Sequence, residues 1–163
     1  MNFYNSCVRN KLLGGMFMPT FMKAIGEIWR CANLYRMKAY EPLNINSFQD
    51  TYLLQICKNP GITQDQLSKR IYVHKSNVAR QVASLEEKGL VYRLNHQDDK
   101  RILQVYPTKK ALDLMPLITK MNQQWNQLLM DELSFDDQQK FLEILSFLAS
   151  KAKEAVEHLE EKE

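Results

Sequence analysis

The chain has few cysteines, which can cross-link a fold, and few glycines and prolines, which interrupt helices and strands. Among its 163 residues are three cysteines, five glycines and five prolines. Cys7, Cys31 and Cys57 are an odd set without a Cys-x-x-Cys pair, so the sequence predicts neither a disulfide framework nor a thiolate zinc site. The shortage of glycine and proline excludes a fibrous or low-complexity chain. We expect a globular, mostly helical protein.

Long hydrophobic runs are missing as well. No stretch reaches the roughly 18 to 20 uninterrupted apolar residues that a membrane-spanning helix needs. The apolar run at 12–22 is interrupted by Gly14, Gly15 and Pro19 and has no small-residue cleavage signature, so we expect no signal peptide. The length is that of about one domain. These features predict a cytoplasmic protein that does not contact a membrane.

The sequence also lacks the usual signatures of catalysis. It contains no Gly-x-Ser-x-Gly, no P-loop and no His-Glu-x-x-His, the patterns that hold a nucleophile, a phosphate or a zinc ion. His74, His96 and His158 lie far apart, and none shares one helix face with another metal ligand. We expect no enzymatic activity, no metal site and no cofactor.

Charge is distributed unevenly along the chain. The net charge is +3, but residues 61–110 carry ten basic and five acidic side chains, whereas residues 131–163 carry four basic and ten acidic ones. A basic middle segment followed by an acidic end predicts one surface that meets a polyanion and a separate helical region that does not.

Hydrophobic periodicity predicts the helices. Apolar residues at spacings of three and four indicate a helix over residues 20–40, and Asn46 or Ser47 can cap the next one. The tetrad from Thr63 to Gln66 is a capping box that opens a short third helix.

A fourth helix is expected from about His74 to Lys88, with Gly89 as its C-terminal stop. Two β-prone runs, 90–94 and 102–106, flank a polar stretch and predict a hairpin with a charged tip.

Two longer helices are expected after the hairpin. One follows Thr108 and ends near Met130, and Ser134 caps the last one. The last helix carries a continuous apolar stripe at Phe141, Leu145, Leu148, Ala152, Val156 and Leu159. A stripe of this length is more than one monomer can bury, so it predicts a homodimer interface.

Helix, turn, helix and hairpin in this order form the plan of a winged helix-turn-helix, whose second helix enters the major groove of DNA. In the fourth helix, Val78, Val82 and Leu85 form the apolar face. Around the opposite face we expect the DNA-binding residues Lys75, Ser76, Asn77, Arg80, Gln81 and Ser84. Arg can bridge guanine O6 and N7, Asn or Gln can bridge adenine N6 and N7, and Ser or Lys can hold phosphate.

The hairpin tip adds Lys100 and Arg101 as further DNA-binding residues. The Asp99 carboxylate would repel phosphate, so its presence at a DNA-binding tip requires an explanation. We expect its carboxylate to hold the Arg101 guanidinium in a bidentate pair and aim it at the groove. The alternative is turn chemistry, since aspartate is favoured in turns.

These segments together resemble the MarR family of bacterial transcriptional regulators. The resemblance rests on ITQDQLSKRI, on KSNVARQVASLEEKGLVYR and on the wing signature Asp99-Lys100-Arg101. It implies a mainly α fold with a small β-hairpin wing, in which a winged helix-turn-helix is joined to a helical dimerisation region. The expected parts are an N-terminal extension at 1–19, a dimerisation helix at 20–45, the winged helix-turn-helix at 46–107 and C-terminal dimerisation helices at 108–163.

The resemblance further implies a homodimer that binds a pseudopalindromic double-stranded DNA operator, as a repressor that a small aromatic or phenolic effector releases. Trp29, Tyr35, Tyr40, Phe48 and Trp125 are candidates for lining an effector pocket, or else are core residues.

Two alternatives remain open at this stage. In the first, Cys7 is an exposed redox sensor, whereas Cys31 and Cys57 lie among apolar residues and are expected to be buried. In the second, the winged helix is a module that binds protein instead of DNA.

Overall fold

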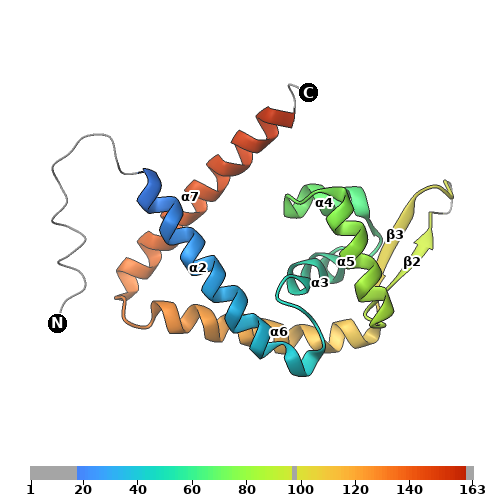
Figure 1. Ribbon diagram of the computed structural model, residues 1–163, viewed down its shortest axis with the longest axis horizontal. Coiled ribbons are helices and arrows are strands. Elements are labelled where there is room, and N and C mark those ends of the chain that lie inside the picture. Colours follow the sequence, from blue (N-terminus) through green and yellow to red (C-terminus); the bar gives the residue numbers. More distant parts are fainter. Residues whose placement is uncertain (1–17, 97–98, 161–163) are drawn as a thin grey trace. The chain divides into compact units, whose positions relative to one another are not determined.

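The computed structural model describes residues 18–96 and 99–160, and most of them are helical (Figure 1). The elements in chain order are α2 (Met18–Ala39), a 3-10 turn η1 (Glu41–Leu43), α3 (Gln49–Lys58), β1 (Ile62–Thr63), α4 (Gln64–Ile71), α5 (Lys75–Glu87), β2 (Val91–Asn95), β3 (Leu103–Pro107), α6 (Lys109–Met130) and α7 (Phe135–Glu160). This order confirms the mainly helical chain with a small hairpin. Within the described ranges, no helix is long and apolar enough to cross a bilayer.

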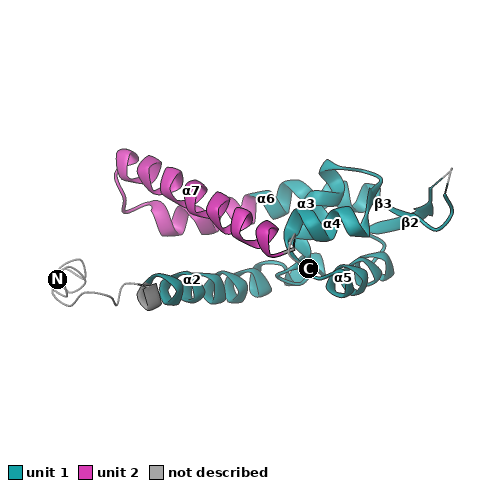
Figure 2. Cartoon of the chain, turned by 90° about the horizontal axis from the view of Figure 1, so that it is seen from above, with its two compact units in different colours: residues 1–119 teal, residues 120–163 magenta. Residues whose placement is uncertain are grey.

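The chain divides into two compact units, residues 1–119 and residues 120–163 (Figure 2). The first unit holds α2 to α5, the sheet and the first half of α6. The second holds the rest of α6 and α7. The helix-turn-helix and its wing therefore belong to one unit and share one core.

The core of the first unit lies between α3, α4, α5 and the sheet. Its fully buried side chains include Leu53, Ile56, Leu67, Leu90 and Val105. The predicted inward face of α5 is confirmed, because Val78, Val82 and Leu85 are all inaccessible to solvent. Their three- and four-residue spacing places them on one side of the helix and leaves the opposite side in solvent.

The start and stop signals that the sequence predicts are present at both ends of the helix-turn-helix. The Thr63 hydroxyl accepts the Gln66 amide at 3.2 Å, and the Gln66 carboxamide accepts the Thr63 amide at 3.0 Å, so the predicted capping box is present. Gly89 has a φ of +67° just after α5, which confirms its role as the stop. The turn between the helices includes Tyr72 in the left-handed region, at φ +53°.

The sheet has three antiparallel strands in the order β1-β3-β2. The hairpin of β2 and β3 was expected, and it pairs Tyr92 with Tyr106, whose rings stack at 5.5 Å between centroids. Strand β1 was not expected, because its two residues are too few to show an alternating pattern. It pairs Ile62 with Val105, and so fixes the start of α4 against the wing.

Helices α2 and α7 expose many large apolar side chains. On α2 these are Phe21, Met22, Ile25, Ile28, Trp29, Leu34 and Met37, and on α7 they are Phe135, Phe141, Leu142, Ile144, Phe147, Val156 and Leu159. The apolar surface of α7 is therefore wider than the predicted stripe, of which Leu145 and Leu148 are half-buried. Apolar surface of this extent is characteristic of an interaction site.

One expectation about cysteine burial is wrong. Cys31 is exposed, although its sequence neighbours are apolar, whereas the adjacent Ala32 is buried. Consecutive residues of a helix point in directions about 100° apart, so apolar neighbours in sequence do not place a side chain in the core.

Candidate nucleic-acid interface

The recognition helix α5 begins at a histidine cap. His74 Nδ1 accepts the backbone N–H of Ser76 at 3.3 Å and lies 2.8 Å from the Ser76 hydroxyl. The imidazole thereby satisfies one of the first amides of α5, which have no partner within the helix. The sequence predicted the start of this helix near His74 but did not predict a capping contact of its side chain.

Three of the predicted DNA-binding residues lie together in solvent on the first turns of α5. Ser76, Asn77 and Arg80 are all exposed. The Arg80 guanidinium donates from Nη2 to Asn77 Oδ1 at 2.6 Å, so it lies along the helix beside the amide. The exposed start of α5 thus presents a hydroxyl, a carboxamide and a guanidinium within one helical turn.

Two more of the predicted residues on this helix, Gln81 and Ser84, are half-buried and turn toward α3. Gln81 Oε1 accepts the side chain of Asn46 at 3.5 Å, and the Ser84 hydroxyl accepts Gln49 Nε2 at 3.1 Å. Ser84 therefore belongs to the contact between α3 and α5, a role that the helical wheel alone did not indicate. Gln81 lies between that contact and the exposed turn.

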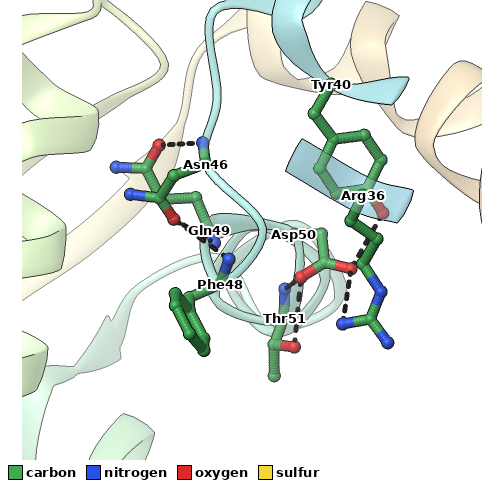
Figure 3. A network of polar contacts seen from close by, with 7 residues as sticks. All are labelled: Arg36, Tyr40, Asn46, Phe48, Gln49, Asp50 and Thr51. Atoms are coloured by element: carbon green, nitrogen blue, oxygen red, sulfur yellow. Dashed lines mark hydrogen bonds and ion pairs between the residues drawn. The ribbon is translucent and has the colours of Figure 1, made fainter. Parts of the chain in front are cut away.

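Asn46 and Gln49 form a second capping box, at the start of α3 (Figure 3). Asn46 Oδ1 accepts the amides of Phe48 and Gln49 at 3.0 and 3.1 Å, and Gln49 Oε1 accepts the Asn46 amide at 3.1 Å. Gln49 Oε1 also accepts Lys88 Nζ at 2.9 Å. The fully buried Gln49 thus ties α3 to α5. The Asn-x-x-Gln spacing could have revealed the capping box, but not the contact with α5.

A buried polar cluster joins the end of α2 to α3 (Figure 3). The Tyr40 hydroxyl donates to Asp50 Oδ2 at 2.9 Å, and Arg36 Nη1 lies 3.9 Å from the same oxygen. Asp50 Oδ1 accepts the Thr51 amide at 2.7 Å. Tyr40, a candidate for the effector pocket, is fully buried, so it is a core residue.

The remaining pocket candidates lie in surroundings that differ from that of Tyr40. Trp29 and Phe48 are both about half exposed and contact each other, with 5.9 Å between ring centroids. Tyr35 is half-buried on the same helix as Trp29. Trp125 belongs to the second compact unit.

The first residue of α5, Lys75, forms an ion pair with Asp65 on α4. Lys69 Nζ contacts the other carboxylate oxygen of Asp65 at 3.2 Å. These two ammonium groups lower the pKa of Asp65 below its ordinary value, with the Lys75 contact the larger cause. No acid is among the predicted DNA-binding residues of α5, but the fold brings one to its start from the preceding helix.

At the wing tip, Asp99, Lys100 and Arg101 are all exposed. Asp99 Oδ1 accepts the backbone N–H of Arg101 at 3.0 Å. Among the described residues, Asp99 makes no ion pair with the Arg101 guanidinium, so the expected bidentate pair is corrected to the turn chemistry that was its alternative. The physical reason is reach, since the amide two residues ahead lies close to an aspartate in a turn.

A separate ion pair joins the wing to the recognition helix. Arg93 on β2 donates from Nε to Glu86 Oε2 on α5 at 3.0 Å, and its Nη2 contacts the same oxygen. This contact lowers the pKa of Glu86 and raises that of Arg93. It links the last turn of α5 to strand β2.

The cysteines divide between different surroundings. Cys57 is half-buried, and burial raises the pKa of its thiol, which disfavours the reactive thiolate. Cys31 is exposed on α2. Cys7, the candidate redox sensor, lies outside the described residues.

Comparisons with known proteins agree with this geometry. A model of the MarR family matches residues 45–103. The HTH-type transcriptional regulator YybA of Bacillus subtilis (strain 168) is 30% identical over 103 residues, which are 63% of this chain and 69% of that protein.

Solved structures extend the likeness to most of the chain. The crystal structure of the transcriptional regulator SlyA shares 29% identity at a TM-score of 0.81, covering 85% of this chain and 98% of that one. A MarR family regulator from Listeria monocytogenes, complexed with 26mer DNA, shares the fold at a TM-score of 0.75 and 24% identity, covering 82% of this chain and 89% of that one.

Proposed function

The chain belongs to the MarR family of transcriptional regulators and carries its DNA-binding winged helix, and we propose that it acts as a homodimeric repressor at a pseudopalindromic operator. The observation that carries the proposal is the exposed cluster of Ser76, Asn77 and Arg80 on the first turns of α5. This cluster favours DNA over the protein partner that the sequence left open as an alternative.

The chemistry of the cluster suits the edges of bases. A guanidinium can donate two parallel hydrogen bonds to guanine O6 and N7, and a carboxamide can both donate to and accept from adenine. Arg80 and Asn77 contact each other, so α5 offers the two groups side by side. We assign base reading to Asn77, Arg80 and Gln81, and phosphate contacts to Lys75 and Ser76.

The wing supplies the second contact region. Lys100 and Arg101 are exposed at the hairpin tip, where Asp99 holds the turn through the Arg101 amide. In winged proteins this hairpin lies beside the recognition helix, and its cations fit the phosphate backbone or the minor groove that flanks the major-groove contact. Ser84 supports the interface by holding α5 on α3.

The dimer is proposed from the apolar surfaces of α2 and α7. Exposed phenylalanine, leucine and isoleucine on both helices need a partner in water, and a second copy of the chain supplies the same surfaces. A two-fold dimer places two recognition helices about one turn of DNA apart, so the operator has half-sites about 10 base pairs apart, centre to centre.

The proposed regulation by an effector is based on membership of the family. DNA complexes have been solved for relatives of the same fold, among them the Listeria monocytogenes protein. We propose that this chain also binds DNA in the cytoplasm and that a small aromatic or phenolic effector changes the spacing of its two recognition helices.

The test is selection of bound sequences from a random duplex pool by the purified protein, repeated at two salt concentrations. Recovery of an inverted repeat with half-sites about one helical turn apart, bound with a steep salt dependence, supports the proposal. A pool without a consensus contradicts it. Sedimentation equilibrium of the same sample tests the dimer, and a monomer would contradict that part alone.

A further inference from the structure

A carboxylate on α4 is placed against the first cation of the recognition helix. Asp65 is the second residue of α4, and its two oxygens contact Lys75 of α5 and Lys69 of its own helix. The side chains are exposed to solvent by 44% for Asp65 and by 70% for each lysine. The three charges are therefore within reach of any polyanion that meets the start of α5.

The role of Lys75 makes this contact significant. We have assigned Lys75 to a DNA phosphate because it opens α5, next to the exposed Ser76. A phosphate and the Asp65 carboxylate compete for the same ammonium group, and the two anions repel each other when both are near it. DNA binding thus requires either a partial loss of the pair between Asp65 and Lys75 or a negative charge held close to the DNA.

We propose that Asp65 is a restraining residue, which weakens the attraction of this protein for DNA phosphates by neutralising Lys75 before DNA arrives. The attraction to phosphate is independent of sequence, whereas base contacts are not. A chain with weaker phosphate attraction spends less time on unrelated DNA. Asp65 therefore raises the share of binding that depends on the base contacts of α5.

The same geometry predicts the effect of salt. Each phosphate that a protein cation neutralises releases a bound counterion, which sets the slope of log affinity against log salt. When Lys75 turns to a phosphate, Asp65 loses that partner but keeps Lys69, and its charge then repels the phosphate. Replacement of Asp65 by a neutral residue removes this repulsion, which is strongest at low salt, so the fall of affinity with salt becomes steeper.

The inference rests on the proposed DNA binding, and its test uses a double-mutant cycle on the full chain. The probe is a fixed duplex of about 30 base pairs, roughly three helical turns, with an arbitrary sequence. Wild type, Asp65→Asn, Lys75→Gln and the double variant are titrated over a range of salt, and thermal unfolding checks that each is folded. Asp113→Asn is the matched control, because Asp113 pairs with Lys109 on α6 in an exposed contact and its loss changes the net charge equally.

We expect Asp65→Asn to bind about two- to fivefold more tightly at low salt, as for the loss of one exposed ion pair. We expect no such gain for Asp113→Asn, or when Lys75 is already glutamine. Equal or weaker binding by Asp65→Asn overturns the inference and indicates that the carboxylate aims Lys75 at the phosphate. A gain that persists without Lys75 also overturns it.

Failure of the proposed function would give a different experimental result from failure of the inference alone. If the wild-type chain binds neither this duplex nor any sequence from the selected pool, DNA binding fails and the inference fails with it. If the wild type binds and Asp65→Asn gains nothing, only the inference is overturned.

Discussion

The carboxamide of Gln49, fully buried at the start of α3, donates to the hydroxyl of Ser84 in the last turn of α5 at 3.1 Å. The two residues are 35 positions apart in sequence. The same carboxamide accepts Lys88 Nζ and the Asn46 amide, so one side chain caps α3 and holds α5. The direction of the exposed face of α5 therefore depends on this contact and on the packing of the apolar side of the helix.

Gln49→Met should lower the free energy of unfolding by about 1 to 3 kcal/mol, because it leaves buried polar groups without partners while keeping the side-chain volume. Chemical denaturation measures this change. DNA affinity should fall as well, since α5 loses a contact that fixes its direction. Gln124→Met, at an exposed position of α6, is the matched control and should leave both quantities unchanged. A stable Gln49→Met variant would contradict the positioning role.

Arg80→Ala and Arg101→Ala should affect DNA binding in different ways. Loss of Arg80 should cost about 1 to 3 kcal/mol of operator binding and relax the base preference at one position of each half-site. Loss of Arg101 should weaken binding to all sequences alike and reduce the salt slope by about 1. Sequence selection and salt titration with each variant separate the two effects. Identical profiles for both variants would argue against the division between base reading and phosphate contact.

Two variants of Asp99 can distinguish its hydrogen bond in the turn from the effect of its negative charge. Asp99→Asn keeps an oxygen that can accept the Arg101 amide, so we expect it to bind DNA at least as well as the wild type. Asp99→Ala removes that acceptor, loosens the tip and should weaken binding. Titration of one duplex with both variants measures the difference. If asparagine is as harmful as alanine, the negative charge is what matters at this position.

The ion pair of Glu86 with Arg93 predicts a pH dependence. Arg93 lowers the pKa of Glu86 in the folded protein below the ordinary 4.5, so the pair contributes stability above that pH and loses it as the pH falls through the lower folded value. The difference in Tm between wild type and Glu86→Gln should be largest near neutral pH and shrink in acid. Glu87→Gln, an equal charge change at the next, exposed residue, is the control. A difference that stays constant from pH 7 to pH 3 would contradict a role for ionised Glu86.

The features that could be predicted depend on residues close together in the chain. The apolar positions of α5, the box of Thr63 and Gln66, and Gly89 after the helix all follow from spacings of a few residues, and all are present in the structure. The hairpin and the exposed start of α5 were predicted for the same reason. A two-residue strand such as β1 offers no pattern, so it was missed.

Local patterns were therefore enough to predict the helices, the hairpin and the side of α5 that faces water, because helix and strand periods and helix caps act over a few residues. The surroundings of that face depend on the tertiary structure. It brought Gln49 to Ser84 and Asp65 to Lys75, and left Cys31 exposed beside the buried Ala32. Such contacts depend on where one helix crosses another, and that geometry is set by the packing of the whole core.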